Sequence, residues 1–194
     1  MKRLLLGAAL AGALALPAYA ALKSGDKAPD FSAKASLAGK EFNFSLKDAL
    51  KKGPVVVYFY PAAYTGGCNL EAHTFAEAKD KFDAAGTTII GVSRDTIQKL
   101  NDFSADPQYC AGKFPVASDA DGAISKAYNL NTMNLNRKVT DTRGAEVTHE
   151  LTERTTLVIT PDYKVIATLS SADDKINPAD HVDKSLAIVQ GLKK

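Results

Sequence analysis

Residues 54–75 have the sequence PVVVYFYPAAYTGGCNLEAHTF, which carries the clearest structural pattern in the chain. The six residues after Pro54 are all β-branched or aromatic, as is typical of a strand buried on both faces of a sheet. Pro61 ends this strand, and a loop is predicted over 62–67. An amphipathic helix follows, with apolar residues spaced by three and four. Its predicted apolar face consists of Phe75, Ala78, Phe82 and Ala85.

The segments on either side extend this pattern into an α/β fold. Residues 87–92 predict a second buried strand, and a strand–helix–strand unit requires a parallel pair with a right-handed crossover. Residues 154–160 and 163–169 predict a hairpin, and Asn177 caps a last helix. Shorter elements are expected at 41–44, 46–52, 96–103, 114–117 and 124–128. Residues 131–152 show no clear pattern. The sequence predicts an α/β, thioredoxin-like fold: a central mixed sheet flanked by helices, with an N-terminal extension.

The first twenty residues are expected to be a secretory signal peptide rather than part of the fold. Lys2 and Arg3 form a basic start, residues 4–16 are apolar, and residues 18–20 (AYA) fit the small-x-small cleavage pattern. The alternative is an uncleaved membrane anchor, although the apolar run is short for a membrane span. Cleavage after Ala20 would leave a single domain over 21–194 that is periplasmic or otherwise exported and has no membrane attachment.

The balance of charges argues against nucleic acid as a partner. The chain of 194 residues contains 24 basic and 22 acidic residues, and 45% of its residues are hydrophobic. Loss of Lys2 and Arg3 with the leader leaves 22 basic and 22 acidic residues, so the mature domain has no net formal charge. It shows no cluster of Lys and Arg and no basic helix face. Nucleic acid is therefore not an expected partner.

The chain has two cysteines, Cys68 and Cys110, and two interpretations of them are open. In an oxidising compartment a pair of thiols forms a structural disulfide unless something keeps it reduced. The position of Cys68 favours a reactive thiol, because it lies at the start of the helix that follows the buried strand. Unpaired backbone N–H groups and the positive end of the helix dipole stabilise a thiolate there.

The residues just before Cys68 suit a small substrate. Gly66 and Gly67 carry no side chains, so such a substrate could reach the sulfur against bare backbone. Thr65 could hydrogen-bond to the thiolate or to a bound oxygen, although threonine at this position also commonly caps a helix. Both uses of Thr65 are compatible with one turn of chain.

Pro61, Thr65 and Cys68 have the spacing Pro-x-x-x-Thr-x-x-Cys, and Glu71 follows three residues later. This motif resembles the active-site signature of the peroxiredoxins. It is most similar to the signature of the Q type, also called bacterioferritin-comigratory proteins. Three further blocks resemble the family in the same order: 89–95 (IIGVSRD), 114–122 (FPVASDADG) and 154–160 (RTTLVIT). The resemblance covers most of the chain after the leader.

The resemblance implies a thiol-dependent peroxidase that reduces hydrogen peroxide and organic hydroperoxides through a sulfenic acid on Cys68. Thr65 and Arg154 would bind the peroxide oxygens and hold the thiolate, and Pro61 would shield and shape the pocket. A guanidinium suits this role because negative charge builds on the leaving oxygen. Glu71 is a weaker candidate, which either complements the helix dipole or also orients the pocket.

The resolving step departs from the commonest Q-type pattern. Many members carry a second cysteine five residues after the first, but this chain has His73 there. The resemblance implies that Cys110 forms an intramolecular disulfide with Cys68 after peroxide attack; the alternative is that Cys110 is an inert thiol. Residues 106–107 (DP) and Gly112 flank Cys110 and favour a loop that moves.

No metal, haem or nucleotide cofactor is implied. His73, His149 and His181 lack metal-ligand spacing with one another or with the cysteines, and all three are interpreted as surface residues. The expected partners are a hydroperoxide substrate and a thioredoxin-like, glutaredoxin-like or small-thiol reductant. The protein is expected to be a monomer or a weak homodimer. The alternative function is a non-catalytic or general thiol–disulfide redox protein of thioredoxin fold with a structural Cys68–Cys110 disulfide. A general oxidoreductase would favour a Cys-x-x-Cys pair, which the chain lacks.

Overall fold

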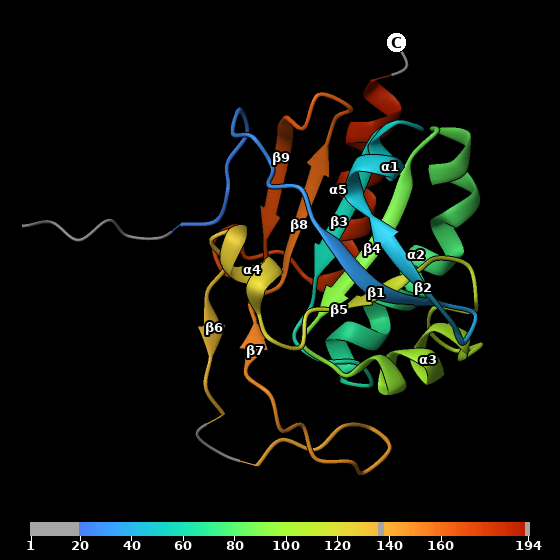
Figure 1. Cartoon of the computed structure of the whole chain (residues 1–194), viewed down its shortest axis with the longest axis vertical. Helices are drawn as coiled ribbons and strands as arrows, with labels where there is room; N and C mark the ends of the chain where they lie inside the picture. Colours follow the sequence, from blue (N-terminus) through green and yellow to red (C-terminus); the bar gives the residue numbers. More distant parts are fainter. Residues whose placement is uncertain (1–19, 136–137, 193–194) are drawn as a thin grey trace, which may run out of the picture.

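The structure, a computed structural model, describes residues 20–135 and 138–192 (Figure 1). The predicted signal peptide falls on residues 1–19, outside the described residues, except for Ala20. The strands are β1 (Ser32–Leu37), β2 (Lys40–Ser45), β3 (Val55–Phe59), β4 (Thr88–Ser93), β5 (Val116–Ser118), β6 (Thr132–Met133), β7 (Leu151–Thr152), β8 (Thr155–Ile159) and β9 (Val165–Ser170). The helices are α1 (Leu46–Leu50), α2 (Gly66–Ala84), α3 (Ile97–Ala105), α4 (Ala123–Ala127) and α5 (Pro178–Gly191). None of these helices is long and apolar enough to cross a membrane.

A seven-stranded mixed sheet forms the centre, in the order β2-β1-β5-β4-β3-β8-β9. The predicted parallel pair is confirmed, since β3 and β4 run parallel with Phe59 opposite Val92. β5 continues the parallel part beside β4, and β8 and β9 form the predicted hairpin on the other side of β3. The predicted thioredoxin-like α/β fold is therefore confirmed.

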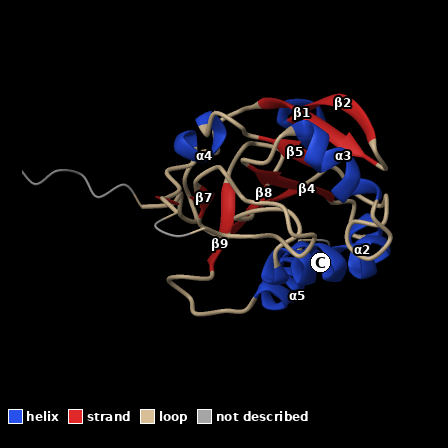
Figure 2. Cartoon of the chain, turned by 90° about the horizontal axis from the view of Figure 1, so that it is seen from below, coloured by secondary structure: helices blue, strands red, loops and turns tan. Residues whose placement is uncertain are grey.

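β3 is apolar throughout because both of its faces are covered. Successive side chains point to opposite faces of a sheet. Val56 and Tyr58 accordingly pack in one core cluster with residues of α2, α3 and α5. The other cluster, around α1 and the segment before β1, contains Val55, Val57 and Phe59. Figure 2 shows α2 and α5 together on one side of the sheet.

Two helix starts follow the predicted capping chemistry. Ser45 caps α1 by accepting a hydrogen bond from the backbone N–H of Asp48 at 3.2 Å. Asn177 and Asp180 form a reciprocal capping box at the start of α5, with Pro178 as the first helical residue. Because α5 packs against α2, this cap also fixes the layer beneath the helix that carries Cys68.

The described residues of the segment for which the sequence showed no pattern, 131–135 and 138–152, are mostly turn and loop. β6 pairs with β7, and between them the backbone N–H of Val147 donates to the carbonyl of Val139 at 2.9 Å. Gly144 has a φ of 85°, which the turn of this small hairpin requires. The described residues between β6 and β7 lie at the foot of the molecule in Figure 1. Few of the described residues of this segment pair with another strand, which agrees with the absence of strand periodicity in its polar sequence.

Candidate active site

Cys68 lies in the first turn of α2, beyond the carboxyl end of β3. Because α2 begins at Gly66, the thiol belongs to the third helical residue. The first backbone N–H groups of a helix lack intrahelical partners, and the helix dipole is positive there. The residue is only 1% exposed. The predicted position of the thiol at a helix start is confirmed, and the sulfur is shielded from bulk water.

Arg154, which immediately precedes β8, brings its guanidinium to this sulfur. Its Nη2 atom donates to Cys68 Sγ at 3.2 Å, and its Nη1 atom donates to Glu71 Oε2. The contact is possible because β8 runs antiparallel beside β3, so that the start of β8 lies next to the end of β3. One guanidinium therefore holds both a sulfur and a carboxylate, and the sheet brings together three residues that the sequence singled out.

The charge of Glu71 depends on its surroundings. Glu71 is fully buried, and burial raises its pKa to about 7, although the Arg154 guanidinium opposes the rise. Burial alone would lower the pKa of Arg154, but Glu71 and Cys68 outweigh it and the pKa of Arg154 is raised. Arg154 therefore stays charged, whereas Glu71 changes its protonation state near neutral pH.

Gly67 gives room to the guanidinium. A Cβ atom at this position would lie 3.2 Å from Arg154 Nη2 and 3.2 Å from Pro178 Cγ, which is tighter than an ordinary contact. At Gly66, by contrast, no heavy atom of the described residues lies within 4 Å of such a Cβ. The two glycines thus differ: Gly67 allows Arg154 to approach Cys68, and Gly66 faces open space.

Thr65 and Pro61 lie in the loop between β3 and α2. Thr65 takes the N-cap position of α2, but its hydroxyl donates to the carbonyl of Ala62 at 2.8 Å instead of capping the helix. Of the two uses left open for Thr65, the hydroxyl neither caps the helix nor donates to the thiolate, because its proton goes to a carbonyl of its own loop. Pro61 is partly buried at the end of β3. Contacts of both residues with a bound peroxide remain predictions.

Cys110 is a free, fully buried thiol in the segment after α3. Burial raises its pKa, and Asp106 adds to the effect, so the group is held as a neutral thiol. It belongs to the same core cluster as Cys68, which is also a free thiol. His73 Nδ1 lies 3.0 Å from the carbonyl oxygen of Gln108. Since a carbonyl only accepts, Nδ1 donates, and α2 is tied to the segment that carries Cys110.

Two of the three histidines are not surface residues, so that interpretation of the sequence is wrong for them. His73 is about half exposed, but His181 is fully buried and His149 is largely buried. Polar partners make this burial possible: His181 Nδ1 lies 3.0 Å from Thr156 Oγ1, and His181 Nε2 lies 2.9 Å from Ser171 Oγ. Burial lowers the pKa of His181 to about 4.

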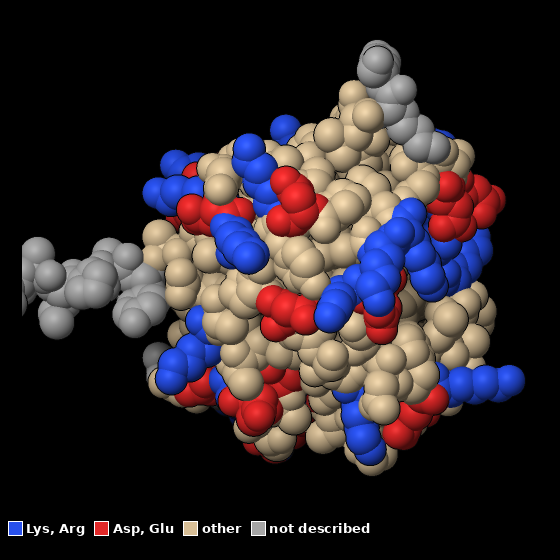
Figure 3. Space-filling view, turned by 45° about the horizontal axis from the view of Figure 1, so that its top comes forward, with Lys and Arg blue, Asp and Glu red and all other residues tan. Residues whose placement is uncertain are grey.

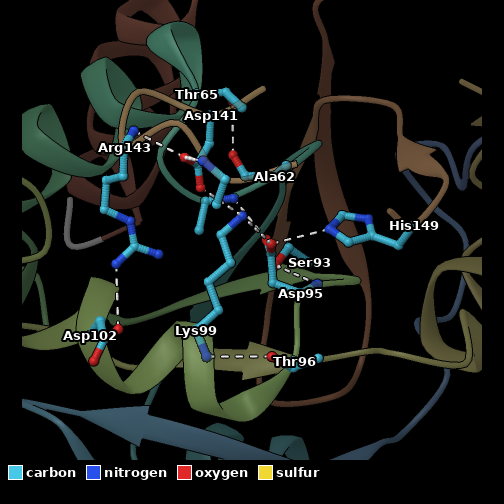
Figure 4. Close-up of polar contacts among 12 residues, drawn as sticks. Ala62, Thr65, Ser93, Asp95, Thr96, Lys99, Asp102, Asp141, Arg143 and His149 are labelled. Atoms are coloured by element: carbon cyan, nitrogen blue, oxygen red, sulfur yellow. Dashed lines mark hydrogen bonds and ion pairs between the residues drawn. The ribbon is translucent and has the colours of Figure 1, made fainter. Parts of the chain in front are cut away.

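Asp95 is a polar residue near the site that was not among the residues expected from the sequence. Its Oδ2 atom accepts hydrogen bonds from the backbone N–H of Ala63 at 2.7 Å and from Ser93 Oγ at 2.8 Å (Figure 4). Ala63 belongs to the loop between Pro61 and Thr65. The available signal was the place of Asp95 just after a parallel strand, where functional groups collect.

Comparison with known proteins identifies the family. Residues 24–168 match the AhpC/TSA family, and this range contains Cys68, Glu71 and Arg154. The chain is a member of the AhpC/TSA family, the peroxiredoxins. This peroxiredoxin is therefore a thiol-dependent peroxidase, an oxidoreductase that acts on peroxides.

Its relatives include the Q type, as the motif predicted. Peroxiredoxin Bcp from Xanthomonas campestris pv. campestris is 32% identical over 140 residues, which covers 72% of this chain and 78% of the relative. The structure of peroxidoxin BcpB from Mycobacterium tuberculosis matches this peroxiredoxin with a TM-score of 0.73 at 28% identity, covering 89% of this chain and 99% of the other. The structure of Xanthomonas campestris peroxiredoxin Q matches with a TM-score of 0.65 at 30% identity, covering 83% and 91%.

Over residues 20–135 and 138–192 of this peroxiredoxin, no group of three or more His, Cys, Asp or Glu side chains is placed to hold a metal ion. The chemistry available at Cys68 is that of a thiol, a guanidinium and a carboxyl group. Such a set can form a nucleophile, bind an oxygen anion and move one proton near neutral pH.

Proposed function

We propose that Cys68 is the peroxidatic thiol of this peroxiredoxin and that Arg154 holds both the thiolate and the peroxide. The observation that carries the proposal is the 3.2 Å contact between Arg154 Nη2 and Cys68 Sγ. Removing a guanidinium from water costs free energy, and a thiol with a purely structural role does not need such a group beside it. The alternative of a purely structural Cys68–Cys110 disulfide does not account for this contact.

In the first step the Cys68 thiolate attacks the hydroxyl oxygen of the hydroperoxide. The sulfur lone pair forms the S–O bond while the O–O bond breaks, and the other oxygen leaves as hydroxide or alkoxide, which takes a proton from water. The sulfur is thereby oxidised to a sulfenic acid, and the peroxide is reduced to water or an alcohol. Negative charge builds on the leaving oxygen, so the N–H donors of Arg154 stabilise the transition state.

The remaining site residues shape this reaction. Glu71 fixes the orientation of Arg154 through Nη1, which leaves Nη2 directed at the sulfur. Thr65 donates to Ala62, so its oxygen lone pairs are available to accept a hydrogen bond from the attacked hydroxyl. Pro61 shields the pocket from water.

We further propose that Cys110 resolves the sulfenic acid. Its sulfur attacks Cys68 Sγ and forms the S–S bond, and the hydroxide that leaves takes the proton of Cys110 to give water. A disulfide requires the two Cα atoms to lie within roughly 7 Å. We expect the Cys110 segment and the first turn of α2 to move until the two Cα atoms lie within this distance. Ala111 has a φ of 51°, a strained conformation that opening of the segment would relieve.

A thioredoxin-like or glutaredoxin-like protein, or a small thiol, then reduces the disulfide. We propose that the enzyme works in the periplasm or another exported location after cleavage behind Ala20, because the first twenty residues have the pattern of a signal peptide. The reductant must then act in that compartment. We expect the mature domain to be a monomer or a weak homodimer.

The proposal is tested by mass spectrometry of the reduced protein after one equivalent of hydrogen peroxide. The parent is expected to form a Cys68–Cys110 disulfide, and Cys110→Ser is expected to hold a sulfenic acid on Cys68. Cys68→Ser is the matched control and should remain unmodified. Equal oxidation of Cys110 in Cys68→Ser and in the parent would contradict the assignment of Cys68. A Cys110→Ser variant that accumulates no more sulfenic acid than the parent would contradict resolution by Cys110.

A further inference from the structure

A buried cluster of charged side chains lies behind the loop that leads to Cys68 (Figure 4). It consists of Asp95 after β4, Lys99 on α3, and Asp141 and His149 from the segment between β6 and β7. Lys99 Nζ lies 3.1 Å from Asp95 Oδ1 and 3.2 Å from Asp141 Oδ2. His149 Nε2 lies 3.1 Å from Asp95 Oδ1. The two carboxylates are almost fully buried, with side chains 1% and 0% exposed, and the two basic side chains are 18% exposed or less.

Asp95 is an ionised carboxylate. Four donors surround its oxygens: the Ala63 N–H, Ser93 Oγ, Lys99 Nζ and the His149 ring. Burial alone would raise the pKa of Asp95, but the hydrogen bonds and the two cations reverse the effect and lower it. The negatively charged Asp95 carboxylate accepts the hydrogen bond from the backbone N–H of Ala63.

The ring of His149 must carry two protons. Its Nδ1 atom lies 2.9 Å from the carbonyl oxygen of Glu150, and its Nε2 atom lies 3.1 Å from the carboxylate of Asp95. Both partners can only accept hydrogen bonds, so both ring nitrogens donate and the ring is an imidazolium. The pKa of His149 agrees with this geometry: burial lowers it, but Asp95 and the Glu150 carbonyl raise it more.

The same segment contacts the active-site loop at a second place. The backbone N–H of Thr142 donates to the carbonyl of Tyr64 at 2.8 Å, and the Arg143 guanidinium lies 3.5 Å from the centre of the Tyr64 ring. Asn69, the residue after Cys68, donates from Nδ2 to Thr142 Oγ1 at 3.4 Å. The segment therefore contacts the chain on either side of Thr65: the loop at Tyr64 and the first turns of α2 at Asn69.

We propose that His149 is a positioning residue of the peroxidase site: as an imidazolium it holds the Asp95 carboxylate on the Ala63 N–H and so fixes the loop that carries Pro61 and Thr65. This inference rests on the proposed role of Cys68. In this inference, His149 and the described residues around it stabilise the conformation of the loop between β3 and α2 through Asp95. His149 acts through Asp95 and touches neither the thiol nor the substrate.

The support that His149 gives to this loop through Asp95 is expected to depend on pH. Asp95 is the charged group that contacts His149 directly, and Lys99 and Asp141 follow through their shared contacts. The neutral Glu150 carbonyl also faces the ring. Loss of the ring proton turns one N–H donor into a lone pair that faces an acceptor. The rate of Cys68 oxidation is expected to fall as pH rises and His149 loses its proton, at a pH above the ordinary value of 6.5 for a histidine.

The test combines kinetics with NMR on the mature protein. The rate constant of Cys68 with hydrogen peroxide is measured by competition with horseradish peroxidase across pH, since the chain has no Trp to report it. His149→Gln should lower the rate roughly tenfold at pH 7 through displacement of the loop, and should abolish the alkaline limb. Glu146→Gln is the matched control from the same segment, because it breaks only an exposed pair with Lys138. This variant should keep the rate and pH profile of the parent.

NMR tests the inference in the parent, independently of how the variants fold. Nitrogen shifts should show both ring nitrogens of His149 protonated at pH 7, and the Ala63 amide should titrate with the same midpoint as the ring. A neutral His149 at pH 7, or a His149→Gln rate and profile equal to those of the parent, would overturn the inference. If peroxide left Cys68 of the parent unoxidised, the proposed function would fail, whereas the NMR titration would still decide whether His149 holds the loop.

Discussion

At the scale of single residues, the proposed chemistry depends on how a nearly buried sulfur would hold a negative charge. A thiolate that is removed from water loses hydration, so its charge must be compensated locally. Arg154 supplies this compensation at 3.2 Å, and the first turn of α2 adds unpaired N–H groups. Glu71 competes for the same guanidinium from the other side. The balance among these three side chains sets the reactivity of Cys68.

The two glycines before Cys68 provide a matched pair of variants. Gly67→Ala should lower the rate constant of Cys68 with hydrogen peroxide roughly tenfold, because the new methyl group pushes Arg154 Nη2 from its 3.2 Å position. Gly66→Ala should leave the rate within about twofold, since its methyl group meets open space. Competition kinetics measures both. Similar losses in the two variants would mean that the approach of Arg154 does not limit the reaction.

Glu71 should make stability depend on pH in a direction opposite to that of an ordinary paired carboxylate. Its folded pKa of about 7 exceeds the ordinary value of 4.5, so its contribution to stability is complete below pH 4.5 and is lost as pH rises through 7. The difference in unfolding free energy between parent and Glu71→Gln should therefore shift by about 3 kcal/mol against the parent between pH 4.5 and pH 8. Urea denaturation followed by circular dichroism measures it. A difference that stays constant over this range would show that Glu71 ionises normally.

At the scale of elements, the proposed disulfide requires the segment that carries Cys110 to rearrange against α2, and the hydrogen bond between His73 and the Gln108 carbonyl resists this rearrangement. His73→Ala removes the hydrogen bond from α2 to the Gln108 carbonyl, which is worth about 1 kcal/mol. Disulfide formation after a peroxide pulse should speed up roughly fivefold while sulfenic acid formation is unchanged. Quenched-flow mass spectrometry separates the two steps.

Glu77→Gln is the control for that experiment. It changes the partner of His73 Nε2 on the same helix but leaves the bond to Gln108 in place. Its disulfide should form at the rate of the parent. Equal rates in His73→Ala and the parent would show that this hydrogen bond does not hold the segment closed.

At the scale of the whole molecule, charged side chains of both signs are mixed on the face shown in Figure 3, where basic and acidic side chains lie next to one another. The proposed cleavage behind Ala20 would leave a domain with 22 residues of each sign. Sedimentation of the mature protein at micromolar concentration should give a monomer with at most weak dimerisation. A stable larger ring would contradict this expectation.

The sequence predicted the central fold because its buried strands and amphipathic helices depend on local patterns. Cys68, Thr65, Glu71 and Arg154 were recognised from a motif and from ordered blocks, and the sheet brings Cys68, Glu71 and Arg154 together. The role of Asp95 and His149 could not be predicted. Their contact joins residues 54 positions apart, and the segment that supplies His149 folds by turns rather than by a regular period.

In the proposed mechanism, the Arg154 guanidinium makes Cys68 a peroxidatic thiol. The most direct test is the rate constant of reduced protein with hydrogen peroxide for the parent and for Arg154→Lys, which keeps the charge but loses the paired donors. Near-ultraviolet circular dichroism of both proteins controls for folding. Arg154→Lys is expected to react roughly a hundredfold more slowly than the parent, with oxygen still transferred to Cys68 alone. A folded Arg154→Lys variant that reacts within about twofold of the parent would contradict this mechanism.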